Sequence, residues 1–387
     1  MTPRPFEIRI PDSSIRDLND RLRAARWPTS LDRESWNDGT SLSFVERLVD
    51  HWLHRFDWRA QEARLNRMPQ YLMQVDGMDV HFVHRRGTGP SPLPLILTHG
   101  WPGSFAEMEH VIPLLADPGS HGGDPEDAFH VVVASLPGYG FSQAPSAPGV
   151  GSREIARSWR RLMEGLGYQR FGAQGGDIGA SVSTWLARLH PKSMVGIHLN
   201  FIPGSFRPPL EGDMPPITAT ERDFRERGTA WSAAEGAYAA LQGTKPQTLS
   251  FSLSDSPVGL AAWIAEKFQL WSDGPGDLPG TITIDTLLTD ISLHWFSDDL
   301  TASLRLYKEN RATPLAFAPG ERVATPLGVA VFPRELPMPP RSWVERVFDV
   351  RRWTTMAAGG HFAALEQPGP LVDDIRAFFR PLRRDRR

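Results

Sequence analysis

Apolar positions in the first part of the chain recur with the period of amphipathic helices. In residues 12–25 they lie three and four apart, and Asp12 and Ser13 are the candidate N-caps of this helix. A second stretch, Ser43–Phe56, has large apolar residues four apart. We therefore predict that the chain opens with helices.

Strand-like patterns follow from residue 71 onward. Tyr71–Val75 and Met78–Val83 are joined by Asp76-Gly77, a strong signal for a tight hairpin. Leu93–Thr98 and His130–Leu136 are short, continuously apolar runs, as in parallel strands that are buried on both faces.

The middle of the chain alternates strands with helices. Helical stretches at Arg153–Leu166 and Ile178–Leu189 flank a short strand at Phe171–Gln174. This alternation predicts an α/β fold with a mostly parallel, doubly wound sheet.

The strand pattern stops for about a hundred residues. Helix-like segments, Ala233–Leu241 and Val258–Trp271 among them, are separated there by loops rich in Pro and Gly. Strands resume at Leu327–Phe332, and a terminal helix is expected near Leu371–Phe379. The expected units are an N-terminal extension, a first core segment, a helical lid and a second core segment, at residues 1–90, 91–202, 203–312 and 313–387.

Composition narrows the class of protein. With 40% hydrophobic and 22% charged residues the chain is globular, and without cysteine it has no disulfide, thiolate metal site or cysteine nucleophile. A net charge of −3 gives no reason to expect nucleic acid or an anionic membrane as partner. No signal peptide or membrane span is visible, so a cytoplasmic protein is expected. The basic end, Arg383 to Arg387, is expected to be solvated.

The sharpest chemical signal is Gly175-Gly176-Asp177-Ile178-Gly179, between a predicted strand and a predicted helix. It is a nucleophile-elbow pattern with Asp in place of Ser. Its small residues allow a turn tight enough to present Asp177, and leave the Ile178 amide free to stabilise an oxyanion. The alternative is a glycine-rich turn in which Asp177 only caps the helix.

A second glycine-rich turn, His99-Gly-Trp-Pro-Gly-Ser104, directly follows an apolar strand. It can aim the Trp101 amide at the same point as the Ile178 amide, making an oxyanion hole. His99 is expected to stabilise the turn rather than to act as a base.

A general base is expected at His361, in Gly359-Gly-His-Phe362, because its order in the chain fits nucleophile, acid, histidine. Glu335 follows the strand Leu327–Phe332 and is the candidate acid. Asp349 is the rival, but it precedes an extended segment, Trp353–Ala357, instead of following a strand.

An Asp nucleophile suits attack on an sp³ carbon, which leaves an alkyl ester on the enzyme. His361 would then activate the water that hydrolyses the ester. Opening an epoxide also requires an acid, and a phenol stays protonated at neutral pH. Tyr238 and Tyr307 fall in the lid segment, where they could serve as acids or only pack.

The chain resembles the microsomal-type epoxide hydrolases over nearly its whole length. The resemblance rests on the three glycine-rich motifs and on several other segments: Arg4-Pro-Phe-Glu-Ile, Arg26-Trp-Pro, Phe56-Asp-Trp-Arg, Thr244-Lys-Pro, Leu253-Ser-Asp-Ser-Pro-Val-Gly-Leu-Ala-Ala-Trp-Ile, Tyr307-Lys-Glu-Asn and Phe332-Pro-Arg-Glu335. It implies an α/β-hydrolase fold with a characteristic N-terminal domain. Soluble bacterial members, including those of enediyne biosynthesis, look most similar, which implies a role in secondary metabolism.

Carried over by position, the resemblance implies Asp177 as nucleophile, His361 as base and Glu335 as its orienting acid. It also implies Tyr238 and Tyr307 as the acids for ring opening. Mammalian members have Trp where this chain has Ile178, so the pocket wall is expected to differ. Their membrane anchor is not expected here.

The expected partners are a small-molecule epoxide and water, with no cofactor or metal; a homodimer is left open. A haloalkane dehalogenase shares the Asp nucleophile, but the lid tyrosines favour an epoxide. A serine esterase is disfavoured because no Gly-x-Ser-x-Gly is present, and a silent binding protein because no member of the site is missing. The sequence leaves open an enzyme that opens the epoxide with a nucleophile other than water.

Overall fold

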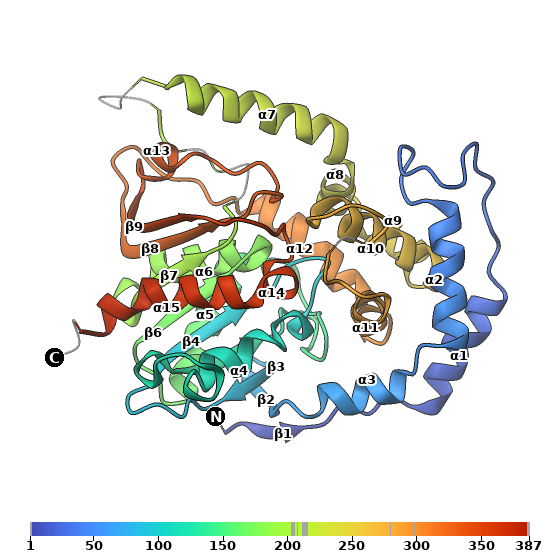
Figure 1. Ribbon diagram of the computed structural model, residues 1–387, viewed down its shortest axis with the longest axis horizontal. Helices are drawn as coiled ribbons and strands as arrows, with labels where there is room; N and C mark the ends of the chain where they lie inside the picture. Colours follow the sequence, from blue (N-terminus) through green and yellow to red (C-terminus); the bar gives the residue numbers. More distant parts are fainter. Residues whose placement is uncertain are drawn as a thin grey trace.

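The computed structural model describes residues 2–202, 206, 208–210, 216–278, 280–297 and 299–384. Its strands form one sheet in the order β1-β2-β3-β5-β4-β6-β7-β8-β9, antiparallel from β1 to β5 and parallel from β5 to β9 (Figure 1). The strands are β1 (Arg4–Phe6), β2 (Gln70–Val75), β3 (Met78–Arg85), β4 (Leu93–Thr98), β5 (Phe129–Ala134), β6 (Phe171–Gly175), β7 (Met194–Leu199), β8 (Val323–Val331) and β9 (Phe348–Thr355). The predicted mostly parallel sheet is confirmed.

Helices cover both faces of this sheet. The helices are α1 (Asp12–Arg23), α2 (Leu42–His54), α3 (Trp58–Leu65), α4 (Val111–Ala116), α5 (Ser152–Gly165), α6 (Asp177–Leu189), α7 (Ala219–Glu235), α8 (Ala237–Thr244), α9 (Pro246–Leu253), α10 (Pro257–Trp271), α11 (Ile284–Trp295), α12 (Leu300–Ala312), α13 (Arg341–Val344), α14 (Ala363–Glu366) and α15 (Pro368–Arg384). Helices α5 and α6 pack in one apolar cluster, whereas α4 and α15 pack in another. The sheet is therefore doubly wound.

The central strands are apolar because both of their faces are covered. Every residue of β4 and of β7 is buried, and each strand pairs in parallel on both sides. Burial of apolar side chains on both faces is the main force that holds such a sheet together. It also fixes the carboxyl ends of β4, β6, β8 and β9 at one edge, and the three glycine-rich turns follow β4, β6 and β9.

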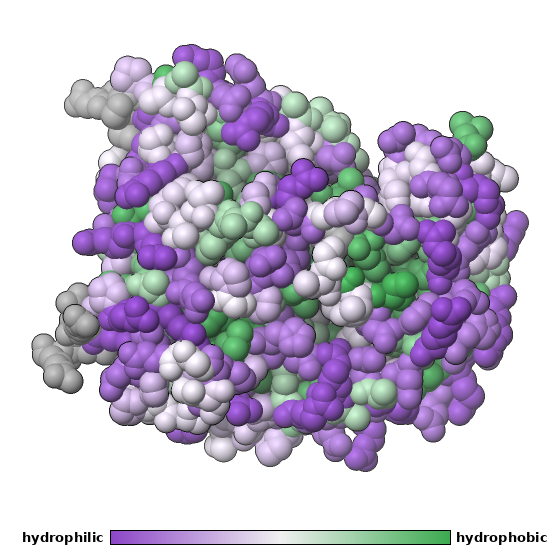
Figure 2. Space-filling view, in the orientation of Figure 1, coloured by the Kyte–Doolittle hydropathy of each residue, from purple (hydrophilic) through white to green (hydrophobic). Residues whose placement is uncertain are grey.

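Helices α7 to α12 form a lid inserted between β7 and β8 (Figure 1). The N-terminal helices α1 and α2 lie beside this lid and contact α10 and α11. Thr40 donates a hydrogen bond to the Ala262 carbonyl at 2.7 Å, and the Trp36 indole donates to Asp277 at 3.0 Å. On the face shown in Figure 2, apolar residues gather over α10 and α11 beside α2. In the part of the chain that the structure describes, no helix is both long and apolar enough to cross a membrane.

The predicted hairpin is present, and Asp76 and Gly77 both have positive φ, at 53° and 81°. The predicted N-caps of the first helix are wrong. The N-cap of α1 is Pro11, whose side chain has no oxygen that could accept a hydrogen bond from the first turn. The Asp12 carboxylate pairs with Arg59 instead.

Other boundaries also differ from the prediction. The helix expected at Ala233–Leu241 is two helices that meet at Gly236, a poor helix former. The strand expected to reach Leu136 ends at Ala134, because the Leu136 amide turns to donate to His99 Nε2. The extended segment expected at Trp353–Ala357 is the end of a longer strand, β9, which starts at Phe348 and therefore includes Asp349.

The expectation of a solvated C-terminal end is wrong for Arg383. Its guanidinium donates to the carbonyls of Asp127 and Ala128, at 2.8 and 2.9 Å, and lies over the ring of Phe129. The last turn of α15 is thereby fastened to the start of β5. Arg386 and Arg387 lie outside the described residues.

Candidate active site

Asp177 is presented by a sharp turn between β6 and α6. Its φ is +45°, a left-handed conformation that is rare for residues other than glycine and is typical of strained functional turns. The turn is possible because Gly179 lacks a side chain: a Cβ there would lie 1.9 Å from the Thr98 carbonyl oxygen. The carboxylate therefore projects into the site instead of capping α6, which has no side-chain cap.

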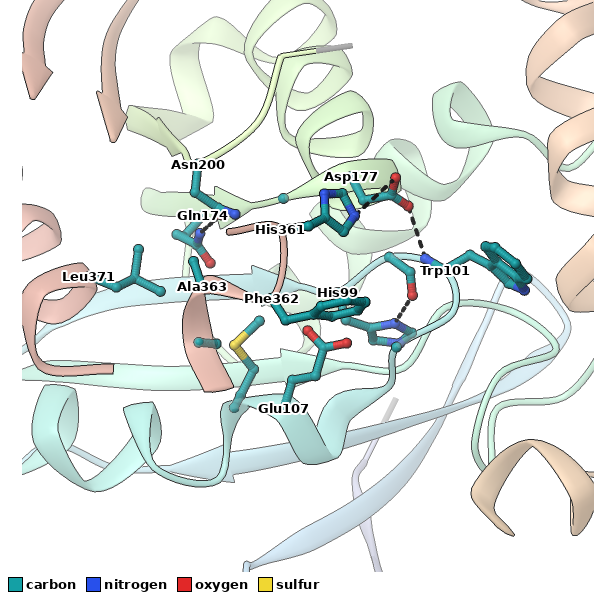
Figure 3. Close-up of a pocket in the computed structure, with 15 residues that line it drawn as sticks. His99, Trp101, Glu107, Gln174, Asp177, Asn200, His361, Phe362, Ala363 and Leu371 are labelled. Carbon is teal, nitrogen blue, oxygen red and sulfur yellow. Dashed lines mark hydrogen bonds and ion pairs between the residues drawn. The ribbon is translucent and has the colours of Figure 1, made fainter. Parts of the chain in front are cut away.

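The Trp101 turn holds one oxygen of this carboxylate. The Trp101 amide donates to Asp177 Oδ1 at 2.9 Å (Figure 3). The turn comes this close because of Gly100, where a Cβ would lie 2.3 Å from the Asp177 side chain. Ile178 lies in the first turn of α6, where amides have no acceptor within the helix. Both predicted oxyanion donors thus flank Asp177.

His361 faces the other oxygen of Asp177. Its Nε2 lies 3.7 Å from Asp177 Oδ2, and its Nδ1 lies 2.6 Å from Glu335 Oε1 (Figure 3 shows the first of these contacts). The side chains of His361 and Glu335 are 4% and 1% exposed, and that of Asp177 is 15% exposed. The imidazole is therefore held between two carboxylates and largely shielded from solvent.

The charge of this arrangement favours a protonated imidazole. Burial alone lowers the pKa of His361, but Glu335, and then Asp177 and Glu107, outweigh it and raise the pKa to about 9. The imidazole thus carries a proton at neutral pH while Asp177 is ionised. Any process that neutralises Asp177 would lower this pKa.

The rival acid lies elsewhere. Asp349, near the start of β9, pairs with Arg351 at 2.8 Å, whereas Glu335 follows the carboxyl end of β8. The β8 and β9 strands run parallel, so the two carboxylates lie at opposite edges of the sheet. Of the two, the structure brings Glu335 to His361.

A second carboxylate, which the sequence interpretation missed, holds the loop that carries His361. Glu366 accepts hydrogen bonds from the amides of Asp273, Gly360 and Phe362, at 2.6, 3.1 and 3.0 Å. The His361 amide itself donates to the Trp271 carbonyl at 2.8 Å. Because Trp271 and Asp273 belong to the lid segment, these hydrogen bonds connect the His361 loop of the core to the lid. No sequence signal marks Glu366, because its role depends on these backbone contacts.

The two lid tyrosines meet at the Trp101 turn. The Tyr238 ring stacks on the Trp101 indole at 5.3 Å, the Tyr307 ring packs edge-on against the same indole at 5.8 Å, and the two phenol rings are 5.9 Å apart. Burial raises the pKa of both phenols. For Tyr238 the negative charge of Asp177 is the next largest cause. Both hydroxyls therefore keep their protons at neutral pH.

A small cavity lies beside Asp177 and His361, and both polar and apolar residues of the core line it. Its volume is about 20 Å³, enough for one water molecule. Glu107, on a short 3₁₀ helix (Phe105–Met108), reaches into it (Figure 3). Burial, together with Asp290, raises the pKa of Glu107 well above its usual range. The sequence interpretation missed Glu107, although it lies only three residues beyond the Trp101 motif.

Comparison with known proteins agrees with this geometry. Residues 3–108 match the family described as "Epoxide hydrolase N terminus", and residues 94–252 match the alpha/beta hydrolase fold. A Stigmatella aurantiaca protein that carries an epoxide hydrolase name is 44% identical, with 98% of this chain and 85% of that protein covered. Rabbit (Oryctolagus cuniculus) epoxide hydrolase 1 is 37% identical, with 97% of this chain and 88% of that protein covered.

Solved structures show the same similarity. The Aspergillus niger epoxide hydrolase superposes with a TM-score of 0.86 at 32% identity, covering 99% of this chain and 97% of that chain. The juvenile hormone epoxide hydrolase of Bombyx mori superposes with a TM-score of 0.82 at 27% identity, covering 99% and 94%. The similarity thus spans core, lid and N-terminal extension together. This protein is an enzyme of the α/β-hydrolase fold and belongs to the epoxide hydrolase family.

Proposed function

We propose that this enzyme opens epoxides through a covalent ester on Asp177. In the first half-reaction, Asp177 Oδ2 attacks a ring carbon, the bond from that carbon to the epoxide oxygen breaks, and a lid phenol gives its proton to that oxygen. The observation that carries the proposal is the position of Asp177, between the imidazole on one side and the Trp101 turn with its two phenols on the other. A phenol that remains protonated is the group this step requires.

In the second half-reaction, His361 Nε2 takes a proton from water, and the water oxygen attacks Cγ of Asp177. The oxyanion that forms at Oδ1 is stabilised by the Trp101 amide, and the Ile178 amide is proposed as the second donor. Collapse expels the diol and restores the carboxylate. The water oxygen stays in Asp177, and its two protons end on the second hydroxyl of the diol and on the phenolate.

Water is the nucleophile that fits the cavity beside His361. The cavity has room for one water molecule, and Glu107, Gln174 and Asn200 line it. Gln174 Oε1 is buried and has no hydrogen-bond partner within the described residues. A water that donates a hydrogen bond to His361 Nε2 can donate its second hydrogen bond to Glu107. A larger carbon nucleophile would not enter a cavity of this size.

Esterification of Asp177 also supports His361 as the base. The ester removes one of the negative charges that raise the pKa of His361, so the imidazole loses its proton more readily when it has to accept one from water. Glu335 then stabilises the imidazolium that forms.

A single-turnover experiment in ¹⁸O-water tests the proposal. With enzyme in excess over a simple aryl epoxide, we expect the label in the peptide that contains Asp177 and not in the diol. The variant Asp177→Ala should show no turnover, and His361→Gln should accumulate an alkylated protein visible by intact mass spectrometry. Label that appears directly in the diol would reject the covalent route.

A further inference from the structure

A buried lysine lies beside one of the two lid phenols. Lys267, on α10, is 2% exposed, and its Nζ lies 4.6 Å from the centre of the Tyr238 ring and 5.7 Å from the Trp271 ring. Its one ion pair among the described residues is with the neighbouring Glu266, at 3.0 Å. Lysine is almost never fully buried without a strong reason.

The position of Lys267 on α10 is one that an apolar residue would normally occupy. Leu260, Ile264, Lys267 and Trp271 are spaced four, three and four apart, and all four are buried. A cation on the apolar face of a lid helix is costly to bury. Its placement against an aromatic face offsets part of that cost, since an ammonium is attracted to the negative face of the ring.

We propose that Lys267 is a positioning residue for ring opening: its ammonium favours negative charge on Tyr238 as this phenol gives its proton to the epoxide oxygen. This inference rests on the proposed function, in which a lid phenol is the acid. In the ground state the ammonium faces a neutral ring. As the proton leaves, the ring gains charge, and the attraction becomes that of two opposite charges in a site shielded from water. The interaction is therefore stronger in the transition state than before it, which is the condition for accelerating a step.

The other charges near Tyr238 act in the opposite direction. Burial, then Asp177, Glu335 and Glu266, raise the pKa of Tyr238 and so oppose the phenolate. The ammonium of Lys267, which lies over the Tyr238 ring, is the charge that favours the phenolate.

The same contacts make the two phenols different. Among the described residues, Lys267 lies over the rings of Tyr238 and Trp271. Its ammonium therefore favours negative charge on Tyr238 more than on Tyr307, whose ring lies 5.9 Å from that of Tyr238. In this proposal Tyr238 is the proton donor.

The test is the rate of alkylation, followed in single turnovers as ester formed on Asp177. Lys267→Met keeps the length of the side chain and removes the charge, and it should slow alkylation about 10- to 30-fold. The matched control is Lys308→Met, which removes the same charge from an exposed position next to Tyr307 in the sequence and should leave the rate within about 2-fold. Lys267→Arg should recover part of the loss.

A double-mutant cycle separates this role from lid packing. If Lys267 acts through the phenol, Lys267→Met should slow alkylation less than about 2-fold in a Tyr238→Phe enzyme, but keep its full effect in a Tyr307→Phe enzyme. An equal loss in all three backgrounds would mean that Lys267 only packs, and would overturn the inference. Wild-type alkylation in Lys267→Met would also overturn it, while leaving the covalent route intact, because the ester would still form.

Glu266→Gln tests the same electrostatic effect on Tyr238 by removing a negative charge instead of a positive one. Its result does not depend on whether the Lys267→Met variant folds. It removes a negative charge that opposes the phenolate and frees the ammonium, so alkylation should become about 2- to 3-fold faster. An unchanged or slower rate would overturn the inference. If no ester forms on Asp177 in the wild-type enzyme, it is the proposed function that fails.

Discussion

The core and the lid contribute to the site in different ways. The core supplies Asp177, Trp101, Glu335 and His361 from turns at the carboxyl ends of parallel strands, where backbone geometry places each group. The lid supplies phenols and a lysine from helices, placed by ring packing against Trp101 and Trp271. The comparison suggests a division of chemistry: the core forms and hydrolyses the ester, and the lid handles the proton of the epoxide oxygen.

Trp271 joins the two regions. Its carbonyl accepts from the His361 amide, and its ring contacts both Tyr238, at 5.2 Å, and His361, at 5.0 Å. A change in the lid can therefore reach the base through one residue at the end of α10. The predictions below ask whether each half-reaction can nevertheless be impaired without the other.

The largest effect is expected from Glu335→Gln. Without the carboxylate, the imidazole loses its orientation and the charge that stabilises its protonated form, so ester hydrolysis should slow by about 10³- to 10⁴-fold. Alkylation should suffer far less, and the ester should accumulate in rapid-quench mass spectrometry. Asp349→Asn is the control and should turn over normally. Ester accumulation in Asp349→Asn, with normal turnover of Glu335→Gln, would reverse the assignment.

The combined change Tyr238→Phe and Tyr307→Phe should impair the other half-reaction, alkylation. Losing both acids should slow alkylation by about 10³-fold, within the range for general acid catalysis. Hydrolysis of ester already formed should change little. Tyr139→Phe is the control, because this phenol is buried but donates to the Ser303 carbonyl at 3.1 Å. Wild-type alkylation in the double variant would remove the phenols from the mechanism.

A smaller effect, which should reach both half-reactions, is expected from Glu366→Gln. Three backbone amides donate to the Glu366 carboxylate. A glutamine replaces one acceptor oxygen with an amide donor, so at least one of these hydrogen bonds is lost. The loss should lower the free energy of unfolding by about 1–3 kcal/mol. Both half-reactions should slow because the His361 loop loosens. Urea unfolding checks the stability, with Glu345→Gln, in a surface pair with Arg341, as the control. Unchanged stability would show that these contacts do not hold the loop.

The smallest effect is a shift in the titration of His361. With Asp177 ionised, the pKa of His361 is raised to about 9, so the neutral base becomes more abundant as the pH rises toward that value. Asp177→Asn imitates the neutral ester and removes one of the charges that raise the pKa. The pKa of His361 should therefore be lower in the variant than in the wild-type enzyme. NMR titration of the imidazole in both proteins measures this, and an equal or higher pKa in the variant would contradict it.

Most of the core could be predicted from the sequence, because its signals are local. An apolar run such as Leu93–Thr98 indicates a buried strand whatever packs on it, and observed β4 has the same bounds. The motif around Asp177 predicts its turn because the backbone packs so closely there that only glycine fits at Gly175 and Gly179. Helix ends were harder to predict: Asp12 and Ser13 are better N-cap residues than Pro11, and a single glycine such as Gly236 lowers helix propensity without fixing where a helix ends.

By itself, then, the sequence determined the α/β architecture and the segments from which the proposed nucleophile, the proposed base and the two lid tyrosines come. The tertiary structure decided which of these side chains meet. It brought Glu335 to His361 and left Asp349 at the other edge, and it brought in Glu107, Glu366 and Lys267, none of which was identified beforehand. The physical reason is that these three act through burial and through partners distant in the chain. A charged residue in a helix or turn looks like a solvated surface group until the fold removes the water around it.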